Sequence, residues 1–448
     1  MDTRNSSHLN RRQFLRAAAA VGTVAGAGIL LDACSSPGSS SGPVTITVMY
    51  NQGELQPTSF TGTLPPSQAY YVNSFNELHK GSITAKFLTF DQTRLTAMLA
   101  SGTPPDFVRT GGGSEMAVLM AKGVTANLQT HFAKSTVIKE DDLQPVNNYY
   151  RWDGHQIGQG DRYGMVKDWS QDAMIWYNTD VFRQKGIPPL DPKTPITYDQ
   201  LLQLGKELTV TTNGKVSVYG ENTAFSWWPE IIPMQILAQN GQQLYSNNGT
   251  KANIANNELF QQAVKWLVDY TQAKIGPSYL IPETTSDNTL WLAKREIISG
   301  WGYWFGGALQ TNGSLPPNAG FAPAPQMGPT PFNSCFGGTG AWIPVKSKQI
   351  DAAFTFMEYY LGGGGPNGGT AQGAQTDPAT NRASGGFGLP ALKSLVKFMP
   401  QKTPAEKAAY EVQQAALAHY GTLVFSPYDT GYTAAWNQYM PDVFNGKT

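Results

Sequence analysis

The sequence predicts an α/β protein with a parallel sheet, divided into two or three domains. Its 448 residues exceed what one hydrophobic core usually accommodates. Between residues 44 and 123, segments typical of strands are followed three times by segments with apolar residues at helical spacing. Strands that alternate with helices in this way favour a parallel sheet covered by helices.

The first part of the chain follows this alternation closely. The expected order is a strand at 44–49, a helix at 68–78, a strand at 83–88, a helix at 92–100, a buried strand at 106–108 and a helix at 114–121. Gly102 and Pro104 end the second helix, and Gly123 ends the third. Loops that follow the carboxyl ends of parallel strands then meet at one edge of the sheet, where ligands bind in open sheets.

A second block of elements begins near Tyr163. Thr197–Gln200 forms a capping box, in which a threonine and a glutamine satisfy the first backbone donors of a helix. The expected helices lie at 180–185, 201–208, 257–271, 351–361 and 404–419. The segment 362–388 is rich in glycine, asparagine and threonine and predicts a mobile surface loop. A phosphate-binding loop is the weaker interpretation, because no Gly-Lys-Ser/Thr follows.

The first 33 residues have the pattern of a bacterial export signal. Arg11 and Arg12 precede an apolar run at 17–31, and a small residue stands before Cys34. The paired arginines indicate the twin-arginine export route. The run is too short to span a bilayer, which needs about 20 residues. A short membrane anchor or a buried alanine-rich helix is the alternative interpretation.

The end of this signal resembles the lipobox of bacterial lipoproteins, Leu-x-x-Cys. Leu31, Ala33 and Cys34 fit that pattern, whereas Asp32 departs from it. The resemblance implies lipidation of the Cys34 thiol and cleavage just before it, so that residues 1–33 are removed. The serine-, glycine- and proline-rich segment 34–43 is then a flexible linker between the lipid anchor and the folded part. This predicts a protein held at the outer side of the cell membrane, periplasmic or at the cell surface.

Charge and composition exclude several classes of function. The chain has 32 basic and 32 acidic residues and no basic stripe, so it has no electrostatic footprint for nucleic acid. With Cys34 acylated, Cys335 has no partner for a disulfide, and it is expected to be a small buried residue. The five histidines are scattered without metal-ligand spacing, at His8, His79, His131, His155 and His419.

Short motifs in a fixed order resemble one family, the family 1 extracellular solute-binding proteins of ABC importers, the maltose-binding-like group. Leu99–Asp106 is similar to the family's Leu-x-x-Gly-x-x-Pro-Asp with one extra residue, and Ile175–Phe182 to its aliphatic-x-Tyr-Asn-x-Asp-x-Phe. The other matches are Tyr163–Met165, Thr197–Leu201, Leu237–Gly241, Gly302–Trp304, Phe336–Gly338 and Gly388–Ala391. The resemblance covers nearly all of the chain after the signal.

The resemblance implies a two-lobe periplasmic-binding-protein fold with a hinge and an interlobe cleft that closes over a ligand. Lobe 1 is expected at 44–165 and 305–361, and lobe 2 at 166–304 and 362–448. It also implies a monomer without enzymatic activity, cofactor or metal, which captures a mono- or oligosaccharide outside the cytoplasm and delivers it to a membrane permease. An exported carbohydrate-active hydrolase, or a binding protein for a polyol or another solute, is the alternative.

Aromatic residues that could stack on a sugar ring lie beside glycine, serine, proline or aspartate, outside periodic apolar runs. Sugar rings present apolar C–H faces, against which aromatic side chains pack. The candidates are Trp169, Trp227, Trp228, Tyr303 and Trp304. Each of them could instead belong to the core, since tryptophan is commonly buried.

Further candidates follow predicted strands or match positions of the family's cleft. They are Asn51, Gln52, Arg109, Thr110, Gly111, Asp168, Gln171, Gly338, Asp429, Tyr432 and Trp436. Planar polar side chains among them can bind hydroxyl groups. Arg109 could equally be a salt-bridged surface residue. A hydrolase would need two carboxylates at a fixed separation, for which Asp168 and Asp172 are conceivable, but sequence cannot give their distance.

Overall fold

The computed structural model describes residues 42–222, 228–246, 249–278, 280–336 and 338–447. The export signal, the lipobox with Cys34 and the side chain of Trp227 lie outside these described residues. Residues Pro43–Thr448 form one compact unit. None of the helices in the described ranges has the length and apolar character needed to cross a bilayer.

The first sheet has five strands in the order β2-β1-β3-β15-β6. Strand β1 (Val44–Tyr50) runs parallel to its two neighbours, β2 (Ile83–Thr89) and β3 (Phe107–Thr110). On the other side, β15 (Gly340–Trp342) runs antiparallel to both β3 and β6 (Gly164–Val166). The predicted parallel arrangement is therefore confirmed for the first three strands, and the sheet is completed by two short segments from later in the chain.

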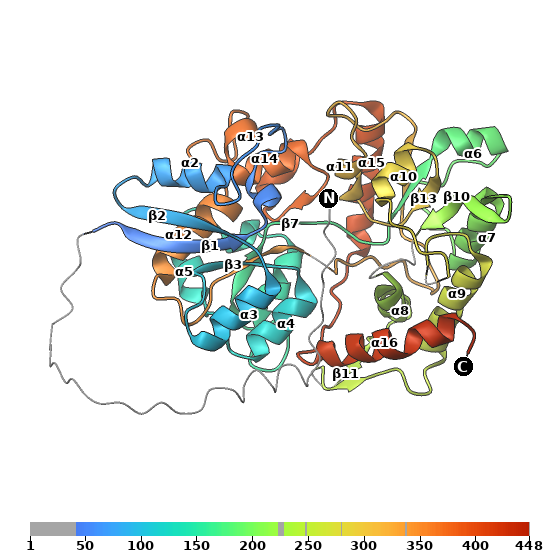
Figure 1. The fold of residues 1–448 in the computed structure, drawn as a ribbon, viewed down its shortest axis with the longest axis horizontal. Helices are drawn as coiled ribbons and strands as arrows, with labels where there is room; N and C mark the ends of the chain where they lie inside the picture. Colours follow the sequence, from blue (N-terminus) through green and yellow to red (C-terminus); the bar gives the residue numbers. More distant parts are fainter. Residues whose placement is uncertain (1–41, 223–227, 247–248, 279, 337, 448) are drawn as a thin grey trace. The chain divides into compact units, whose positions relative to one another are not determined.

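The helices between these strands begin and end within two residues of the predicted positions. They are α2 (Tyr70–Leu78), α3 (Gln92–Ser101) and α4 (Gly113–Ala121). The Asp91 carboxylate caps α3 by accepting a hydrogen bond from the backbone N–H three residues later, and Gly102 ends it in the left-handed conformation with φ 76°. Figure 1 shows α2 on one side of β1 and β2, with α3 and α4 on the other.

The second sheet has the order β14-β8-β13-β10-β9. Within it, β10 (Lys215–Asn222) runs parallel to β13 (Glu296–Ser299), and the other neighbours are antiparallel. The remaining strands are β14 (Ala319–Ala322), β8 (Ile175–Asn178) and β9 (Val210–Thr212). All residues of β8 and β13 are buried, as expected for strands covered on both faces.

The predicted helices at 180–185, 201–208, 257–271 and 404–419 are formed beside the second sheet, together with four described helices that were not predicted. The capping box of Thr197 and Gln200 begins α7 (Tyr198–Leu208), which packs on β10. The other predicted helices are α6 (Thr179–Lys185), α9 (Glu258–Ala273) and α15 (Pro404–Ala416), and those that were not predicted are α8 (Trp228–Gln239), α10 (Asp287–Leu292), α11 (Phe305–Leu309) and α16 (Asp429–Phe444). The predicted helix 404–419 is shorter than expected, because its last three residues form a 3₁₀ turn.

The sequence predicts a mobile loop at 362–388, and this prediction is wrong for the second half of the segment. Here α13 (Gly373–Thr376) and α14 (Pro378–Gly385) are formed. The buried carboxylate of Asp377 organises the segment, since it accepts hydrogen bonds from the backbone of Gly365 and from the N–H and hydroxyl of Thr380. A buried acceptor that satisfies loop backbone donors fixes a sequence whose composition alone suggests mobility.

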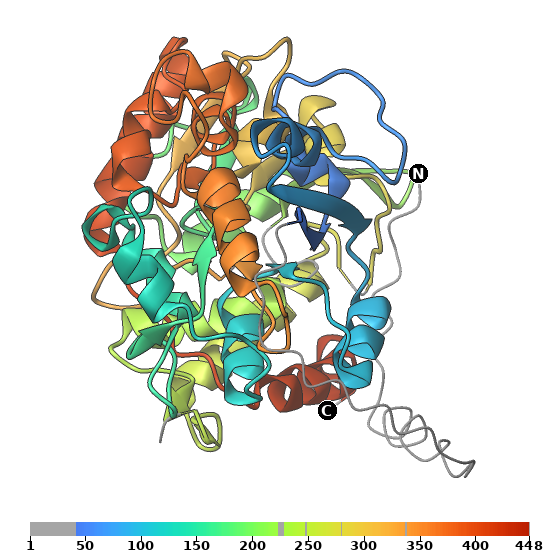
Figure 2. The same cartoon turned by 90° about the vertical axis from the view of Figure 1, so that its left-hand side faces the viewer.

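Segments from the later part of the chain join both sheets. Within 305–361, expected in lobe 1, β14 belongs to the second sheet, whereas β15 and α12 (Ile350–Leu361) belong to the first. Within 362–448, expected in lobe 2, α14 packs against α12, and α16 packs against α9. Figure 2 shows α12 beside the strands of the first sheet. Strand pairing places β14 and β15, which follow each other in the sequence, in different sheets. The chain therefore crosses between the two sheets at more positions than the expected lobe boundaries imply.

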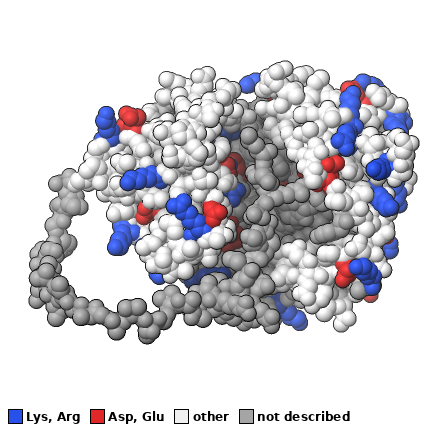
Figure 3. Space-filling model, in the orientation of Figure 1, with Lys and Arg blue, Asp and Glu red and all other residues white. Residues whose placement is uncertain are grey.

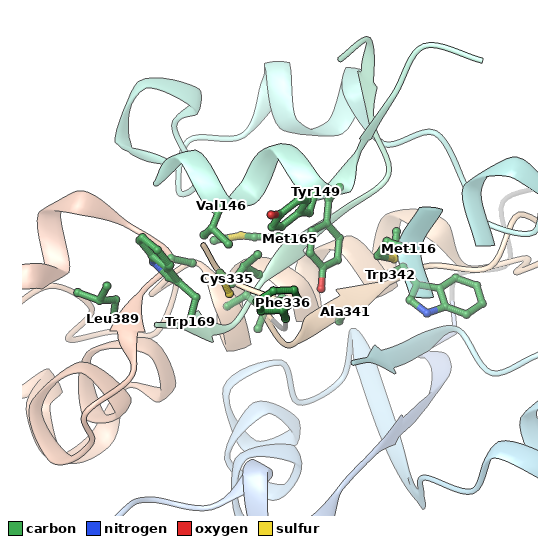
Figure 4. Close-up of a cluster of buried hydrophobic side chains, with 14 of the residues drawn as sticks. Met116, Val146, Tyr149, Met165, Trp169, Cys335, Phe336, Ala341, Trp342 and Leu389 are labelled. Atoms are coloured by element: carbon green, nitrogen blue, oxygen red, sulfur yellow. The ribbon is translucent and has the colours of Figure 1, made fainter. Parts of the chain in front are cut away.

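The remaining described elements are short. They are α5 (Gln129–Lys134), β4 (Arg151–Trp152), β5 (Asp161–Arg162), β7 (Asp168–Trp169), β11 (Tyr245–Ser246), β12 (Lys251–Ala252), β16 (Leu389–Pro390) and five 3₁₀ helices. The pair β7–β16 is antiparallel, with Trp169 opposite Leu389. Figure 4 shows Trp169 and Leu389 in a buried cluster with Cys335 and Phe336. Cys335 is buried there, as predicted.

Candidate functional site

A cavity of about 740 Å³ is lined by residues that follow strands of both sheets. This volume is within the range of about 300–1,000 Å³ that is usual for small-molecule sites. On its first side lie Gly111 and Ser114, after β3, and Lys167 and Asp168, after β6. Thr339, just before β15, completes this side. We name these five residues the polar wall.

The charged groups of the polar wall are held by a chain of ion pairs. The Nζ atom of Lys167 is 2.9 Å from Oε1 of Glu54 and 3.2 Å from Oδ2 of Asp168. At the far end of the chain, Nε of Arg109 is 2.8 Å from Oε2 of Glu54. The hydroxyl of Thr339 donates to Oδ1 of Asp168 at 3.1 Å. Asp168 is therefore fixed from two directions, with its carboxylate at the cavity.

The ionisation of this chain follows from its pairing. Burial alone would raise the pKa of Glu54, but the positive charges of Lys167 and Arg109 lower it to about 2. Burial would likewise lower the pKa of Lys167, but Asp168 and Glu54 raise it above its usual value. Glu54 and Lys167 are thus both charged at neutral pH.

The opposite side of the cavity is apolar. Ile231 and Met234 come from α8, and Trp304, Gly307 and Ala308 come from the start and body of α11. We name these five residues the apolar wall. Trp304 is 39% exposed and packs edge-on against Trp301 and Phe305. It stands at the N-cap of α11, where the chain turns after β13.

The base of the cavity consists of chain segments that run between the two sheets. Trp169 and Asp172 come from the segment after β6, and Cys335 and Phe336 from the segment before β15. These segments are hydrogen-bonded to each other, because the carboxylate of Asp172 accepts from the backbone N–H of Phe336 at 2.7 Å. Phe387 and Phe425 add two more aromatic side chains.

Comparison with known families identifies the chain. The family model for bacterial extracellular solute-binding proteins matches residues 59–365, which is more than half of the sequence. The chain belongs to this family. None of the curated protein sequences matches this solute-binding protein at a significant level.

Solved structures of the same fold include several ABC transporter binding proteins. A substrate-binding protein from Listeria monocytogenes in complex with cycloalternan has a TM-score of 0.69 at 19% identity, over 91% of this chain and 95% of that one. A solute-binding protein from Thermotoga lettingae with bound tagatose has a TM-score of 0.69 at 18% identity, over 90% and 95%. The maltose/maltodextrin-binding domain from Bdellovibrio bacteriovorus with maltotriose has a TM-score of 0.64 at 16% identity, over 90% and 95%. This solute-binding protein therefore has the two-lobe fold of periplasmic binding proteins.

Five of the candidate residues lie on the cavity surface of the solute-binding protein. They are Gly111, Asp168, Trp169, Trp304 and Gly338. Trp228 and Asp429 are the first residues of α8 and α16, and the structure describes their backbone only.

Other aromatic and amide candidates lie in the interior. Tyr303 is fully buried, and its ring packs against Trp176 and Phe387. Trp436 is 5% exposed in the core of the second sheet, and the partly buried Tyr432 packs against it. The buried Gln171 donates from its side chain to the backbone carbonyl of Ala416. These side chains hold the fold together beside or beneath the cavity.

The polar candidates after β1 and β3 surround Glu54 and Glu115 and do not reach the cavity surface. Asn51 donates to Glu54 at 2.6 Å, and Arg109 forms the salt bridge that was its alternative interpretation. The hydroxyl of Thr110 donates to Glu115 at 3.1 Å. The side chain of Gln52 donates to the backbone carbonyls of Leu64, Pro65 and Gln68.

Sequence reasoning missed several residues of the cavity surface. Lys167 and Thr339 stand directly beside the predicted candidates Asp168 and Gly338 in the sequence, and this proximity is the signal that could have found them. Ser114 follows Gly111 at the start of α4 in the same way. Ile231, Met234, Phe387 and Phe425 carry no sequence signal that distinguishes them from core residues, since only the arrangement of both sheets exposes them to one cavity.

Proposed function

We propose that this protein captures a carbohydrate in the cavity and delivers it to the membrane permease of an ABC importer. The observation that supports this most is the pairing of two unlike walls. Trp304 offers an exposed indole face on one side, and Asp168 and Thr339 offer fixed polar atoms on the other. A sugar ring needs both, because its C–H faces pack on aromatic rings and its hydroxyls bind to carboxylates.

The bound molecules of similar structures agree with this ligand class. Cycloalternan, tagatose and maltotriose are carbohydrates, and a binding protein from Agrobacterium vitis holds the polyol mannitol. A mono- or oligosaccharide is the ligand that we propose, with a polyol as the alternative from the same chemistry.

Closure of two lobes over the ligand is part of the proposal. A ligand that contacts both walls binds the closed form better than the open form, and only this difference in affinity can drive closure. The proposed lobes contain one sheet each, and the segments at the base of the cavity, including Asp172 and Phe336, act as the hinge.

The proposed location is the outer face of the cell membrane, with the protein as a monomer anchored through Cys34. Replacing Cys34 by serine is expected to release the protein from the membrane fraction without unfolding it. Persistence in that fraction after a high-salt wash would contradict lipidation. For the export route, changing Arg11 and Arg12 to lysine should leave folded protein inside the cell, and normal export would point to the general secretory route.

A thermal-shift screen with mono-, di- and oligosaccharides and polyols tests the proposed function. A ligand at 100 times its dissociation constant stabilises the folded state by about 2.7 kcal/mol, which moves the melting temperature measurably. The same mixtures should contain no cleavage products afterwards. Absence of a shift with every sugar and polyol would contradict carbohydrate binding, and hydrolysis products would favour the alternative of a hydrolase.

A further inference from the structure

We propose that the cavity selects uncharged saccharides and rejects saccharides that carry a carboxylate. This inference rests on the proposed function and narrows its ligand class. It is carried by the charges at the cavity, which are arranged so that the protein's own groups already neutralise the positive charge a carboxylate would need.

Three of the described residues that line the cavity have ionisable side chains, namely Lys167, Asp168 and Asp172. Lys167 forms an ion pair with Asp168, and the carboxyl group of Asp172 accepts from the backbone N–H of Phe336, so the described part of this surface offers carboxyl groups and a cation that is already paired. A neutral hydroxyl can donate to such carboxylates and gain a charge-assisted hydrogen bond. A ligand carboxylate at the same place would lose its water and face like charges, which disfavours binding.

Lys167 is the cation that a carboxylate on the ligand would have to use. Its side chain is only 9% exposed, and its Nζ atom lies between Glu54, at 2.9 Å, and Asp168, at 3.2 Å. Glu54 in turn contacts Arg109 at 2.8 Å. Charges therefore alternate from Arg109 through Glu54 and Lys167 to Asp168. The positive charge of Lys167 positions Asp168 and is neutralised by Asp168 and Glu54, so it does not attract a carboxylate on a ligand.

The start of α4 could also attract an anion, because backbone N–H groups and the helix dipole point toward the cavity surface there. Gly111 and Ser114 lie at this end of the helix and line the cavity. However, Glu115 in the first turn of α4 binds two of the donors next to this end of the helix. Its Oε2 atom accepts from the backbone N–H of Gly111 at 2.5 Å and from the hydroxyl of Thr110 at 3.1 Å. Two donors just before α4, the N–H of Gly111 and the hydroxyl of Thr110, are thus already used within the protein.

Matched pairs of neutral and acidic sugars test the inference on the wild-type protein. Suitable pairs are glucose and glucuronate, galactobiose and digalacturonate, and mannotriose and trimannuronate, measured by calorimetry at neutral pH. In each pair where at least one sugar binds, we expect the dissociation constant of the uronate to be at least ten times that of the neutral sugar. A uronate that binds as tightly as the neutral sugar, or more tightly, would overturn the inference and leave the proposed function standing. Failure of every sugar and polyol of the thermal-shift screen to bind would overturn both the inference and the proposed function.

The variant Glu54→Gln tests whether the ion chain is the cause. It removes one negative charge, so the excess positive charge of Lys167 and Arg109 should reduce the uronate-to-neutral ratio of dissociation constants at least threefold. Damage to the fold alone would weaken both ligands and leave that ratio unchanged, which would contradict the assigned role of the chain. The control Glu283→Gln removes a carboxylate that pairs with Arg295 at 3.6 Å beside the second sheet, away from the cavity surface, and should not alter the ratio.

Discussion

The two sheets supply the cavity with walls of opposite character. Beside the first sheet, the polar wall consists of groups whose charges and hydrogen bonds are satisfied within the protein, as the contacts of Lys167 and Asp168 show. Beside the second sheet, the apolar wall presents Trp304 with 39% of its surface exposed. The difference shows how one cavity can hold both the hydroxyl groups and the apolar face of a sugar, which is why we place ligand binding there.

Buried carboxyl groups differ between the same two halves. Burial raises the pKa of both Glu54 and Glu296, but Glu54 contacts two cations that lower its pKa to about 2. The charges that act on Glu296 are those of Asp287 and Glu221, which raise its pKa further. Burial thus raises the pKa in both places, and the two cations beside Glu54 reverse its effect. At the surface, both signs of charge are scattered over the face shown in Figure 3.

The largest effect is expected from Lys167→Met. This change leaves the half-buried Asp168 without its cation and the half-buried Glu54 with Arg109 alone, and loss of one partner from a buried ion pair costs up to about 3–5 kcal/mol. Urea unfolding at neutral pH measures the free energy. The control Lys265→Met removes an exposed partner of Asp269 and should change stability by less than about 1 kcal/mol. Equal effects of the two changes would remove the distinction between the polar wall and the ordinary surface.

A smaller effect, confined to ligand binding, is expected from Trp304→Ala. Loss of the exposed indole should weaken saccharide binding by more than about 1 kcal/mol, since an aromatic contact of this kind contributes about that much beyond its buried area. The unfolding free energy without ligand should change little. Trp291, which is 1% exposed, is the matched control, because its change to alanine should cost about 3–5 kcal/mol of stability. A large loss of stability in Trp304→Ala, with affinity kept, would move Trp304 into the core.

Glu54 beside the first sheet and Asp287 beside the second should contribute to the pH dependence of stability with opposite signs. Glu54 has a lowered pKa, so its stabilising effect is present above about 4.5 and is lost as the pH falls toward about 2. Asp287 has a pKa raised by burial to about 6, so its effect is present below about 4 and is lost as the pH rises through about 6. Unfolding free energies of wild type, Glu54→Gln and Asp287→Asn across this pH range measure both contributions. Glu54→Gln should reduce only the loss of stability at acidic pH, and Asp287→Asn only the loss as the pH rises through about 6. The reverse result would contradict the assignment.

The smallest effect is expected from Glu296→Gln. Burial and the neighbouring Asp287 raise the pKa of Glu296 well above its usual value, which favours the protonated form, and glutamine has the charge and nearly the shape of that form. Its side-chain oxygen can still accept the hydrogen bond from Asn222, which is 3.0 Å long in the native protein. The unfolding free energy should change by less than about 1 kcal/mol. A loss above about 2 kcal/mol would show that Glu296 is ionised and that its environment resembles that of Glu54 more than we infer.

Local signals in the sequence predicted much of the fold. The capping box of Thr197 and the alternation between residues 44 and 123 depend on neighbouring residues, and the corresponding elements were predicted to within a few residues. The order of segment 362–388 was missed, because the acceptor that fixes it, Asp377, acts through contacts that composition does not show.

The cavity was harder to predict, because it depends on contacts between distant segments. Glu54 and Lys167 are 113 positions apart, so their ion pair leaves no local pattern. Tyr303 and Trp304 are adjacent and chemically alike, yet the turn into α11 buries the first and exposes the second. The motif Gly302–Trp304 predicts both residues as candidates, but only the packing around the turn decides which side chain reaches the cavity.

A crystal structure of the protein with a saccharide selected by the thermal-shift screen tests the central claim most directly. We predict a sugar ring packed against the indole of Trp304, with a hydroxyl group donating to the carboxylate of Asp168 and the ion pair between Lys167 and Glu54 unbroken. A saccharide bound elsewhere on the protein, with Trp304 and Asp168 free of contact to it, would contradict the assignment of this cavity as the binding site.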